Sequence, residues 1–283
     1  MPLLSAQQLC LSLPDRSRRG IFGRAPELRI LRHIDIDLEP GESLGIVGES
    51  GSGKTSLGRT LLRLLRPTSG RIVFDGEDIT HVDETRLRPL RAKIQMVFQD
   101  PLSSLNPRHR VESILAQPLL AYRRVADVQA GRRAAHVLLE RVGLSSELAR
   151  RYPHELSGGQ RQRVGIARAI ALEPKLIVAD EIVSGLDVST QAQILILLRE
   201  LKQASALIFI SHDLSVVRVL CDRVLVLHRG EAVESGACDR VFARPQHAYT
   251  KALLEAILLP DVDAGWGGGK QGPLTPERRA PAP

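Results

Sequence analysis

Cysteine is scarce in this chain of 283 residues, and so are long apolar runs. The three cysteines, Cys10, Cys221 and Cys238, are odd in number, lie far apart and form no C-x-x-C pair. Such spacing supports neither a disulfide framework nor a cysteine metal site. The three thiols are therefore predicted to be reduced and to have no part in function.

No apolar run approaches the roughly 20 residues that span a bilayer, which excludes a transmembrane helix. The N-terminal stretch MPLLSAQQLCLSLPDRSRRG lacks a basic segment followed by an apolar one with a small-residue cleavage site. We therefore expect no secretory signal and a chain that stays in the cytoplasm. The formal charge of +7 is spread along the sequence rather than gathered in one segment, so no nucleic-acid partner is expected.

Short apolar segments alternate with helical patterns along most of the chain, and no repeat is visible. This alternation predicts an α/β fold with a mainly parallel sheet covered by helices on both faces. The predicted strands are SLGIVG, RIVF, IQMVF, LIVA, ALIFI and RVLVL, and the predicted helices include KTSLGRTLLRLL, VSTQAQILILLRELKQ and LSVVRVL.

Other segments depart from this alternation. Residues 1–40 predict short β-strands around a loop rich in Pro, Arg and Gly, whereas residues 102–156 predict a helical insert between two parts of one sheet. Residues 260–283 are rich in Pro and Gly with little to bury and are predicted to be disordered. Residues 1–259 are thus expected to form one domain, with a C-terminal helix over about 245–259.

Residues 48–55, GESGSGKT, match the phosphate-loop pattern G-x-x-x-x-G-K-[ST]. A predicted strand precedes the match and a predicted helix follows it, which disfavours a glycine-rich turn with an incidental lysine. We assign the backbone N–H groups from Ser50 to Lys54 to the α and β phosphates of a nucleotide, the Lys54 side chain to the β and γ phosphates, and Thr55 to Mg²⁺. The nucleotide-binding set is predicted as Gly48, Glu49, Ser50, Gly51, Ser52, Gly53, Lys54, Thr55 and Ser56.

Residues 176–181, LIVADE, place two carboxylates at the end of a predicted buried strand. Asp180 suits the binding of Mg²⁺, through water. Glu181 lies one step further, where a carboxylate could polarise the water that attacks the γ-phosphate. A solvated acid pair is the alternative, and the phosphate loop disfavours it.

Residues 154–170, HELSGGQRQRVGIARAI, predict an amphipathic helix with a basic face, and Ser157 and Gln160 fit a capping box at its start. Gly158 and Gly159 are costly choices in a first helical turn, at roughly 1 kcal/mol each relative to alanine. A bare helix N-terminus is suited to binding an anion. We infer that an anion binds there.

Together these motifs resemble the nucleotide-binding subunit of an ATP-binding cassette (ABC) transporter, from near the N-terminus to about Leu259. Besides the phosphate loop and the acid pair, the chain has Gln99 after a strand in QMVFQD, the signature LSGGQ, SGLD over 184–187, and His212 in ISHD. The signature residues are Leu156, Ser157, Gly158, Gly159 and Gln160. The resemblance implies the phosphate-loop NTPase fold, RecA-like, with an N-terminal antiparallel β subdomain and a helical insert.

The resemblance also implies roles for single residues. Two such subunits pack head to tail, so that the signature of one closes over ATP on the phosphate loop of the other. Gln99 would contact Mg²⁺ or the attacking water, His212 would hydrogen-bond the γ-phosphate, and Asp187 would lie at the dimer interface. Taken alone, Gln99 could be a loop residue, His212 a surface histidine and Asp187 a helix cap.

Two departures from the family pattern stand out. Members usually carry an early aromatic residue that stacks on adenine, and Phe22 is the one aromatic residue in the stretch LSLPDRSRRGIFGR. Members also often have proline after the catalytic glutamate, where this chain has Ile182. The second change is expected to leave the acid pair intact and alter the stiffness of the next turn.

The segments DPLSSLNPRHRV and PQHAYTKALLEAI are similar to the branch that imports oligopeptides, dipeptides and nickel. That likeness implies ATP-driven uptake at the cytoplasmic face of the cell membrane, with a related ATPase subunit, as a heterodimer or a homodimer, two permease subunits, and indirectly a substrate-binding protein. Peptides are the favoured cargo, and nickel or its chelate is the alternative. A soluble ABC protein of DNA repair or translation and a purely regulatory cassette are more remote alternatives.

Overall fold

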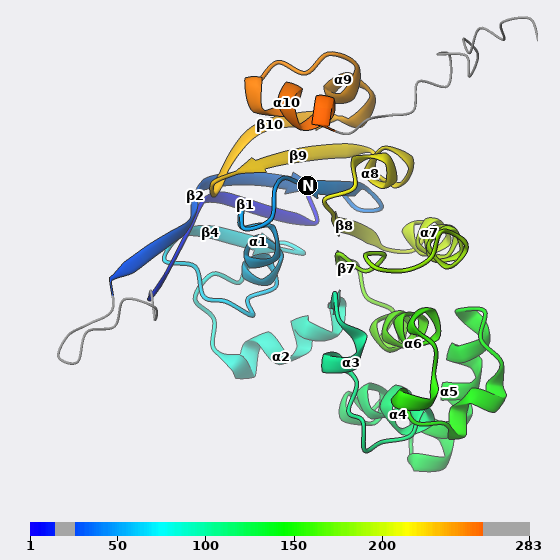
Figure 1. The fold of residues 1–283 in the computed structure, drawn as a ribbon. Coiled ribbons are helices and arrows are strands. Elements are labelled where there is room, and N and C mark those ends of the chain that lie inside the picture. Colours follow the sequence, from blue (N-terminus) through cyan, green and yellow to red (C-terminus); the bar gives the residue numbers. More distant parts are fainter. Residues whose placement is uncertain (15–25, 257–283) are drawn as a thin grey trace, which may run out of the picture.

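Two β-sheets and the helices around them build the fold in the computed structural model, which describes residues 1–14 and 26–256 (Figure 1). The first sheet is antiparallel, in the order β2-β1-β4-β5, and the second has the order β10-β9-β3-β8-β7-β6. In the second sheet all neighbours pair in parallel except β10 and β9. The strands are β1 Leu4–Pro14, β2 Glu27–Leu38, β3 Ser43–Val47, β4 Ser69–Phe74, β5 Glu77–Asp78, β6 Ile94–Val97, β7 Leu176–Asp180, β8 Ala206–Ile210, β9 Arg223–His228 and β10 Glu231–Ala237.

Helices connect most of these strands. The α-helices are α1 Lys54–Leu61, α2 Glu84–Lys93, α3 Pro101–Ser104, α4 Val111–Ala121, α5 Val128–Arg141, α6 Gly158–Ile170, α7 Val188–Lys202, α8 Leu214–Leu220, α9 Cys238–Ala243 and α10 Ala248–Ala256, and the 3₁₀ helices are η2 Ser146–Arg150 and η3 Pro153–Glu155. Within residues 1–14 and 26–256, no helix combines the length and the apolar character that crossing a bilayer requires.

The parallel sheet is buried on both faces, as its apolar strands predicted. On β8, Ala206, Ile208 and Ile210 pack with the antiparallel sheet and α1, whereas Leu207 and Phe209 pack on the opposite side with helices such as α6 and α7. Successive side chains of a strand point to opposite faces, so this split places a separate apolar core on each side of the sheet. The predicted mainly parallel α/β fold with an N-terminal antiparallel sheet is confirmed.

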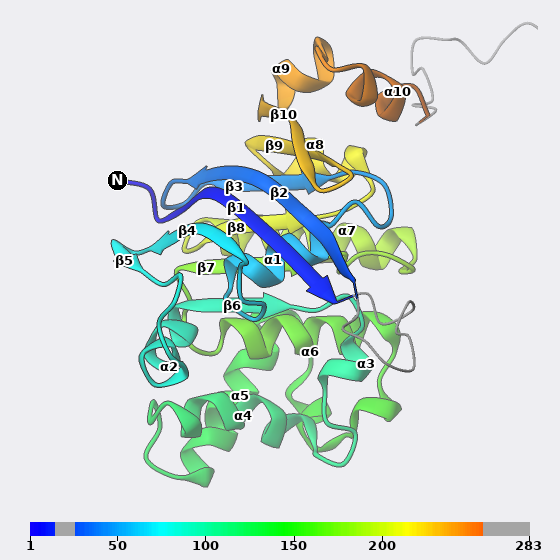
Figure 2. The ribbon, with the colours of Figure 1, turned by 90° about the vertical axis from the view of Figure 1, so that its left-hand side faces the viewer.

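The helical run from α3 to α6 leaves the sheet after β6 and returns to it at β7, which is the parallel neighbour of β6. Figures 1 and 2 show α4 and α5 at one end of the molecule and α9 and α10 at the opposite end, with the sheets between them.

Some local predictions were wrong or incomplete. The helix predicted over KTSLGRTLLRLL ends at Leu61, because Arg63 takes a left-handed φ of 54° and the Leu64 N–H bonds back to the Arg59 carbonyl. Helix α2 and strands β5 and β10 were not predicted. Phe22, the last residues of the predicted C-terminal helix and the predicted disordered tail of residues 260–283 lie outside the described residues.

Candidate active site

The phosphate loop follows β3, whose five residues are all buried, and runs into the first two residues of α1, Lys54 and Thr55. Gly48, Gly51 and Gly53 have positive φ angles of 150°, 81° and 107°, which side chains other than glycine rarely adopt. A Cβ at Gly48 would lie 2.1 Å from the Leu227 carbonyl oxygen of β9. The glycines therefore permit both the turn and its close packing on the sheet.

Lys54 points back into this loop and is almost fully buried. Its Nζ donates hydrogen bonds to the carbonyl oxygens of Gly48 at 2.9 Å and Glu49 at 2.8 Å. Burial lowers the pKa of Lys54, and the nearby carboxylates of Glu181 and Asp180 oppose that shift. A phosphate that replaced the two carbonyls would add negative charge beside this buried ammonium group.

Thr55 and Asp180 meet across the site from α1 and the end of β7. The Thr55 hydroxyl donates to Asp180 Oδ1 at 2.9 Å. Burial raises the pKa of Asp180, and the Thr55 hydrogen bond works in the opposite direction. A hydroxyl and a carboxylate side by side are hard oxygen ligands, the type that Mg²⁺ prefers.

Glu181 is the residue around which the predicted side chains of Gln99, His212 and Lys54 gather. Its Oε2 accepts a hydrogen bond from Gln99 Nε2 at 2.9 Å, and its Oε1 lies 3.7 Å from His212 Nδ1 and 4.0 Å from Lys54 Nζ. Its backbone has a φ of 48°, and its N–H donates to the Ile210 carbonyl of β8 at 2.9 Å. A left-handed backbone at a non-glycine residue is strained, and such strain clusters at functional sites.

The rest of the predicted loop lies beside these groups. Ser52 is buried, and its carbonyl accepts the Gly230 N–H at 3.0 Å, while the Ser56 carbonyl accepts the Thr60 hydroxyl at 2.7 Å. Ser50 and Gly51 are exposed at the tip. One contact to the loop was not predicted: the Tyr249 hydroxyl accepts the Glu49 N–H.

The signature segment starts α6 with the predicted capping box. The Ser157 hydroxyl accepts the Gln160 N–H at 3.2 Å, and Gln160 Oε1 accepts the Ser157 N–H at 3.0 Å. Leu156 is buried in the core on the helical side of the sheet. In the described part of the chain, no hydrogen bond or ion pair joins residues 156–160 to residues 48–56, so the structure does not bring the two motifs together within one subunit.

The two signature glycines differ in what surrounds them. A Cβ at Gly159 would lie 2.3 Å from Thr190 Cγ2 at the start of α7, whereas at Gly158 its nearest neighbour would be Leu186 Cδ2 at 3.6 Å. Packing within the chain therefore accounts for the absence of a side chain at Gly159. A Cβ at Gly158 would make only an ordinary van der Waals contact, so an external anion remains the reason we infer for that glycine.

This difference predicts opposite effects of alanine on stability. Gly159→Ala is expected to lower the free energy of unfolding by about 1–3 kcal/mol, because the added methyl group overlaps Thr190. Gly158→Ala is expected to leave it unchanged or raise it by up to about 1 kcal/mol, because alanine favours the helix. Urea unfolding of the two variants measures the difference, and equal midpoints would rule out the packing explanation.

Asp187 caps α7 in this structure. Its carboxylate accepts hydrogen bonds from the Ser189 hydroxyl, the Thr190 hydroxyl and the Thr190 N–H, at 2.6, 2.7 and 2.9 Å. The Ser189 hydrogen bond, followed by those from Thr190, holds the pKa of Asp187 well below its ordinary value. The helix-cap interpretation is therefore correct, and an exposed cap leaves room for a second contact across an interface.

A phosphate loop between β3 and α1, with a buried carboxylate at the end of a nearby parallel strand, defines the class of phosphate-loop nucleotide hydrolases. Within that class, the ABC transporter family model matches residues 31–184, more than half of the sequence. The chain belongs to the ABC transporter family, and its site is that of an ATPase.

Curated relatives extend the likeness over most of the chain. A putative peptide import ATP-binding protein of Brucella ovis is 48% identical over 265 residues, which cover 93% of this chain and 81% of that protein. The oligopeptide transport ATP-binding protein OppF of Salmonella typhimurium is 48% identical over 264 residues, covering 92% and 79%. The glutathione import ATP-binding protein GsiA of Salmonella paratyphi A is 48% identical over 263 residues, but the matched region spans only 42% of that longer protein.

Solved structures share the same fold. The ATP-binding cassette MJ0796, in a dimeric post-hydrolysis state bound to ADP and Pi, superposes with a TM-score of 0.74 at 28% identity and covers 83% of this chain and 98% of that one. The protein cbiO1 of Clostridium perfringens, part of an ABC transporter complex, gives a TM-score of 0.71 at 29% identity, covering 86% and 91%.

Proposed function

We propose that this chain hydrolyses ATP to power the import of peptides through a membrane permease. The observation that carries the proposal is the convergence of Gln99, His212 and Lys54 on the Glu181 carboxylate beside the phosphate loop. Relatives named as peptide, oligopeptide and glutathione importers support this type of cargo over the nickel alternative.

ATP binding begins at the phosphate loop. The backbone N–H groups from Ser50 to Lys54 bind the α and β phosphates, and the Lys54 ammonium group leaves the two loop carbonyls to bind the β and γ phosphates. The burial of Lys54 excludes water from this contact, which strengthens a charge-assisted hydrogen bond.

The oxygen ligands of Thr55 and Asp180 fit a magnesium ion, with Gln99 as a third candidate ligand. Bound there, Mg²⁺ would neutralise charge on the phosphates. Glu181 accepts the proton of the attacking water as general base. Gln99 orients its carboxylate through the hydrogen bond to Oε2, and His212, beside Oε1, hydrogen-bonds the γ-phosphate.

The second half of the site is expected to come from a partner ATPase subunit. Leu156 anchors the start of α6, the capping box of Ser157 and Gln160 fixes its first turn, and the open N-terminus at Gly158 faces the γ-phosphate on the partner's phosphate loop. Asp187 lies at the same interface. The dimeric state of MJ0796 supports this arrangement, and a related, non-identical partner remains our expectation.

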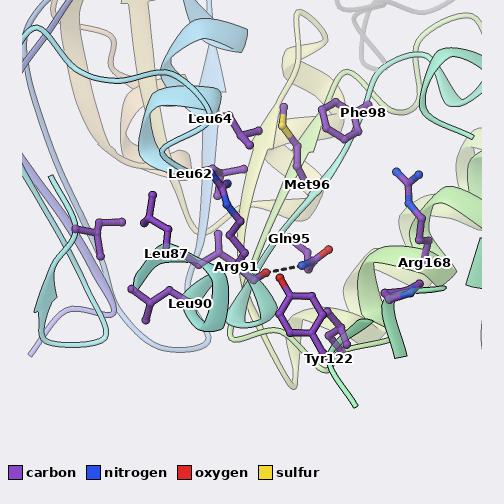
Figure 3. Close-up of a pocket in the computed structure, with 14 residues that line it drawn as sticks. Leu62, Leu64, Leu87, Leu90, Arg91, Gln95, Met96, Phe98, Tyr122 and Arg168 are labelled. Carbon is purple, nitrogen blue, oxygen red and sulfur yellow. Dashed lines mark hydrogen bonds between the residues drawn. The ribbon is translucent and has the colours of Figure 1, made fainter. Parts of the chain in front are cut away.

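A groove next to Gln99 is suited to bind the permease (Figure 3). It has a volume of about 310 Å³ and lies between α2, β6 and the C-terminal end of α1 on one side and α4 and α6 on the other. Its lining is mainly apolar, with Arg91 and Arg168 at the sides, and it includes Phe98, the neighbour of Gln99. A short cytoplasmic helix of a permease subunit seated here would press on the segment that bears Gln99 and so reach Glu181.

Leu64 lines this groove and is 44% exposed. Leu64→Asp is expected to abolish co-purification with the permease subunits, because a carboxylate cannot enter an apolar contact without losing its hydration. ATP binding by the isolated chain should change less than about twofold. Val219→Asp on α8, at a side chain of similar exposure, is the matched control and should keep the permease bound.

In the assembled importer, two ATP molecules close the ATPase dimer, closure moves the permease subunits toward inward release of cargo, and hydrolysis reopens the dimer. The chain then works at the cytoplasmic face of the membrane, and a substrate-binding protein delivers peptides from the other side. Affinity purification of the tagged chain from its own cells tests this assembly. Recovery of two permease subunits and a second ATPase is expected, and recovery of the chain alone would contradict it.

A further inference from the structure

Among the described residues, a hydrogen bond from the loop to the Tyr249 side chain joins helix α10 to the phosphate loop. The Tyr249 hydroxyl accepts a hydrogen bond from the Glu49 backbone N–H at 2.9 Å, across 200 residues of sequence. The Tyr249 ring stacks on the His228 imidazole at the end of β9, with ring centroids 3.9 Å apart and planes inclined by 11°. Burial raises the pKa of the Tyr249 phenol, so it remains a neutral acceptor at physiological pH.

The peptide that Tyr249 contacts is the first of the loop. Its N–H, from Glu49, donates to Tyr249, and its C=O, from Gly48, accepts the Lys54 ammonium group at 2.9 Å. Gly48 packs so closely on β9 that a Cβ would lie 2.1 Å from the Leu227 carbonyl. This peptide plane is therefore held at both ends, by the lysine that binds phosphate and by α10.

Hydrogen bonds between β10 and the residues before α10 hold Tyr249 in place. The Glu234 carboxylate of β10 accepts the N–H groups of Gln246 and His247 at 2.9 and 3.1 Å, and His247 Nδ1 accepts the Tyr249 N–H at 3.1 Å. Thr250, the next residue, is 1% exposed. The segment PQHAYT thus fixes the start of α10, and with it the position of the Tyr249 hydroxyl.

We propose that Tyr249 is a positioning residue for ATP binding, acting through the Gly48–Glu49 peptide. Its hydroxyl holds this peptide, the first of the loop, in place when Lys54 leaves the Gly48 carbonyl for the phosphates. The one loop N–H that it occupies, that of Glu49, lies outside the set from Ser50 to Lys54 assigned to the phosphates. Without the hydroxyl the peptide loses the hydrogen bond at its N–H, and ATP must do more of the ordering of the loop as it binds. The inference rests on the proposed use of the loop for ATP.

Calorimetric titration of the full chain with Mg-ATP tests the proposal. Tyr249→Phe keeps the ring and its stack and removes only the hydroxyl. Its Kd for ATP is expected to rise about 3- to 10-fold, the loss of one hydrogen bond, while the thermal midpoint without ATP stays within about 2 °C of wild type. Tyr152→Phe, which removes the hydroxyl of another tyrosine whose ring stacks on a histidine, His154, is the matched control and should bind ATP as wild type does.

The assembled transporter gives a second readout. There, Tyr249→Phe should raise KM for ATP by a similar factor and leave kcat unchanged, because Glu181 and its partners are untouched. An unchanged Kd in Tyr249→Phe beside tight wild-type binding would overturn this inference alone. A lower thermal midpoint, or a fall in kcat without a rise in KM, would assign Tyr249 a merely structural role and also overturn it. A wild-type chain that binds no ATP would overturn the proposed function together with this inference.

Discussion

Glu181→Gln is expected to reduce steady-state ATP hydrolysis in the assembled transporter about 100-fold or more. Glutamine keeps the size of the side chain and a hydrogen bond to Gln99, but it cannot accept the proton of the attacking water. ATP binding should be retained, and closed dimers should accumulate because the step that reopens them is blocked. Phosphate release and ATP binding, measured on the same preparation, separate the two effects.

The partner ATPase subunit must carry the equivalent change in this assay, because its site could otherwise sustain turnover. Glu140→Gln, at an exposed position of α5, is the matched control and should leave hydrolysis at the wild-type rate. Turnover that survives in the doubly changed assembly would show that Glu181 is not the general base. A loss of ATP binding together with turnover would instead assign Glu181 to nucleotide binding.

Lys54→Ala should weaken ATP binding about 10- to 100-fold, the effect of losing a charge-assisted contact to phosphate. The change also removes the buried ammonium group that bridges the Gly48 and Glu49 carbonyls, so the loop loses two internal hydrogen bonds. Equilibrium binding of Mg-ATP to the isolated chain measures the effect directly.

Lys251→Ala removes an exposed lysine from α10 and is the control for loss of one positive charge. Its Kd for ATP should match that of wild type. An unchanged Kd in Lys54→Ala would mean that the nucleotide does not use this loop. Equal losses in both variants would point to general electrostatic attraction instead.

The parts of the site that are contiguous in sequence could be predicted. The phosphate loop over residues 48–55 carries its own strand, glycines and lysine, and the capping box of Ser157 and Gln160 spans four residues. Residues close together in the sequence form the loop and the capping box, so their spacing was sufficient to predict both features. The alternation of short apolar strands likewise predicted a parallel sheet buried on both faces.

Contacts between distant segments could not be derived from spacing. Gln99 and Glu181 meet across 82 residues, and Glu49 and Tyr249 across 200. Tyr249 packs partly against the core, and the role of its hydroxyl depends on where α10 folds back. The packing of Gly159 on Thr190 could not be predicted either, because helix propensity does not show which residue of another helix lies opposite a glycine.

The missed elements have weak patterns. Half of the residues of helix α2, ETRLRPLRAK, are charged, the helix contains Pro89, and its few buried residues include Leu87 and Leu90. Strand β10, EAVESGA, lies at an edge with no fully buried residue, so no alternation marks it. Tertiary pairing with β9 stabilises β10 where local propensity does not.

Uptake of a labelled tripeptide by proteoliposomes tests the central claim most directly. The vesicles would contain the complete importer purified with this chain, its substrate-binding protein on the receiving side, and ATP on the side of the ATPase subunits. The account predicts ATP-dependent accumulation of peptide that Glu181→Gln abolishes and that ⁶³Ni²⁺ does not replace. Accumulation of nickel without peptide, or peptide uptake that continues without ATP, would contradict it.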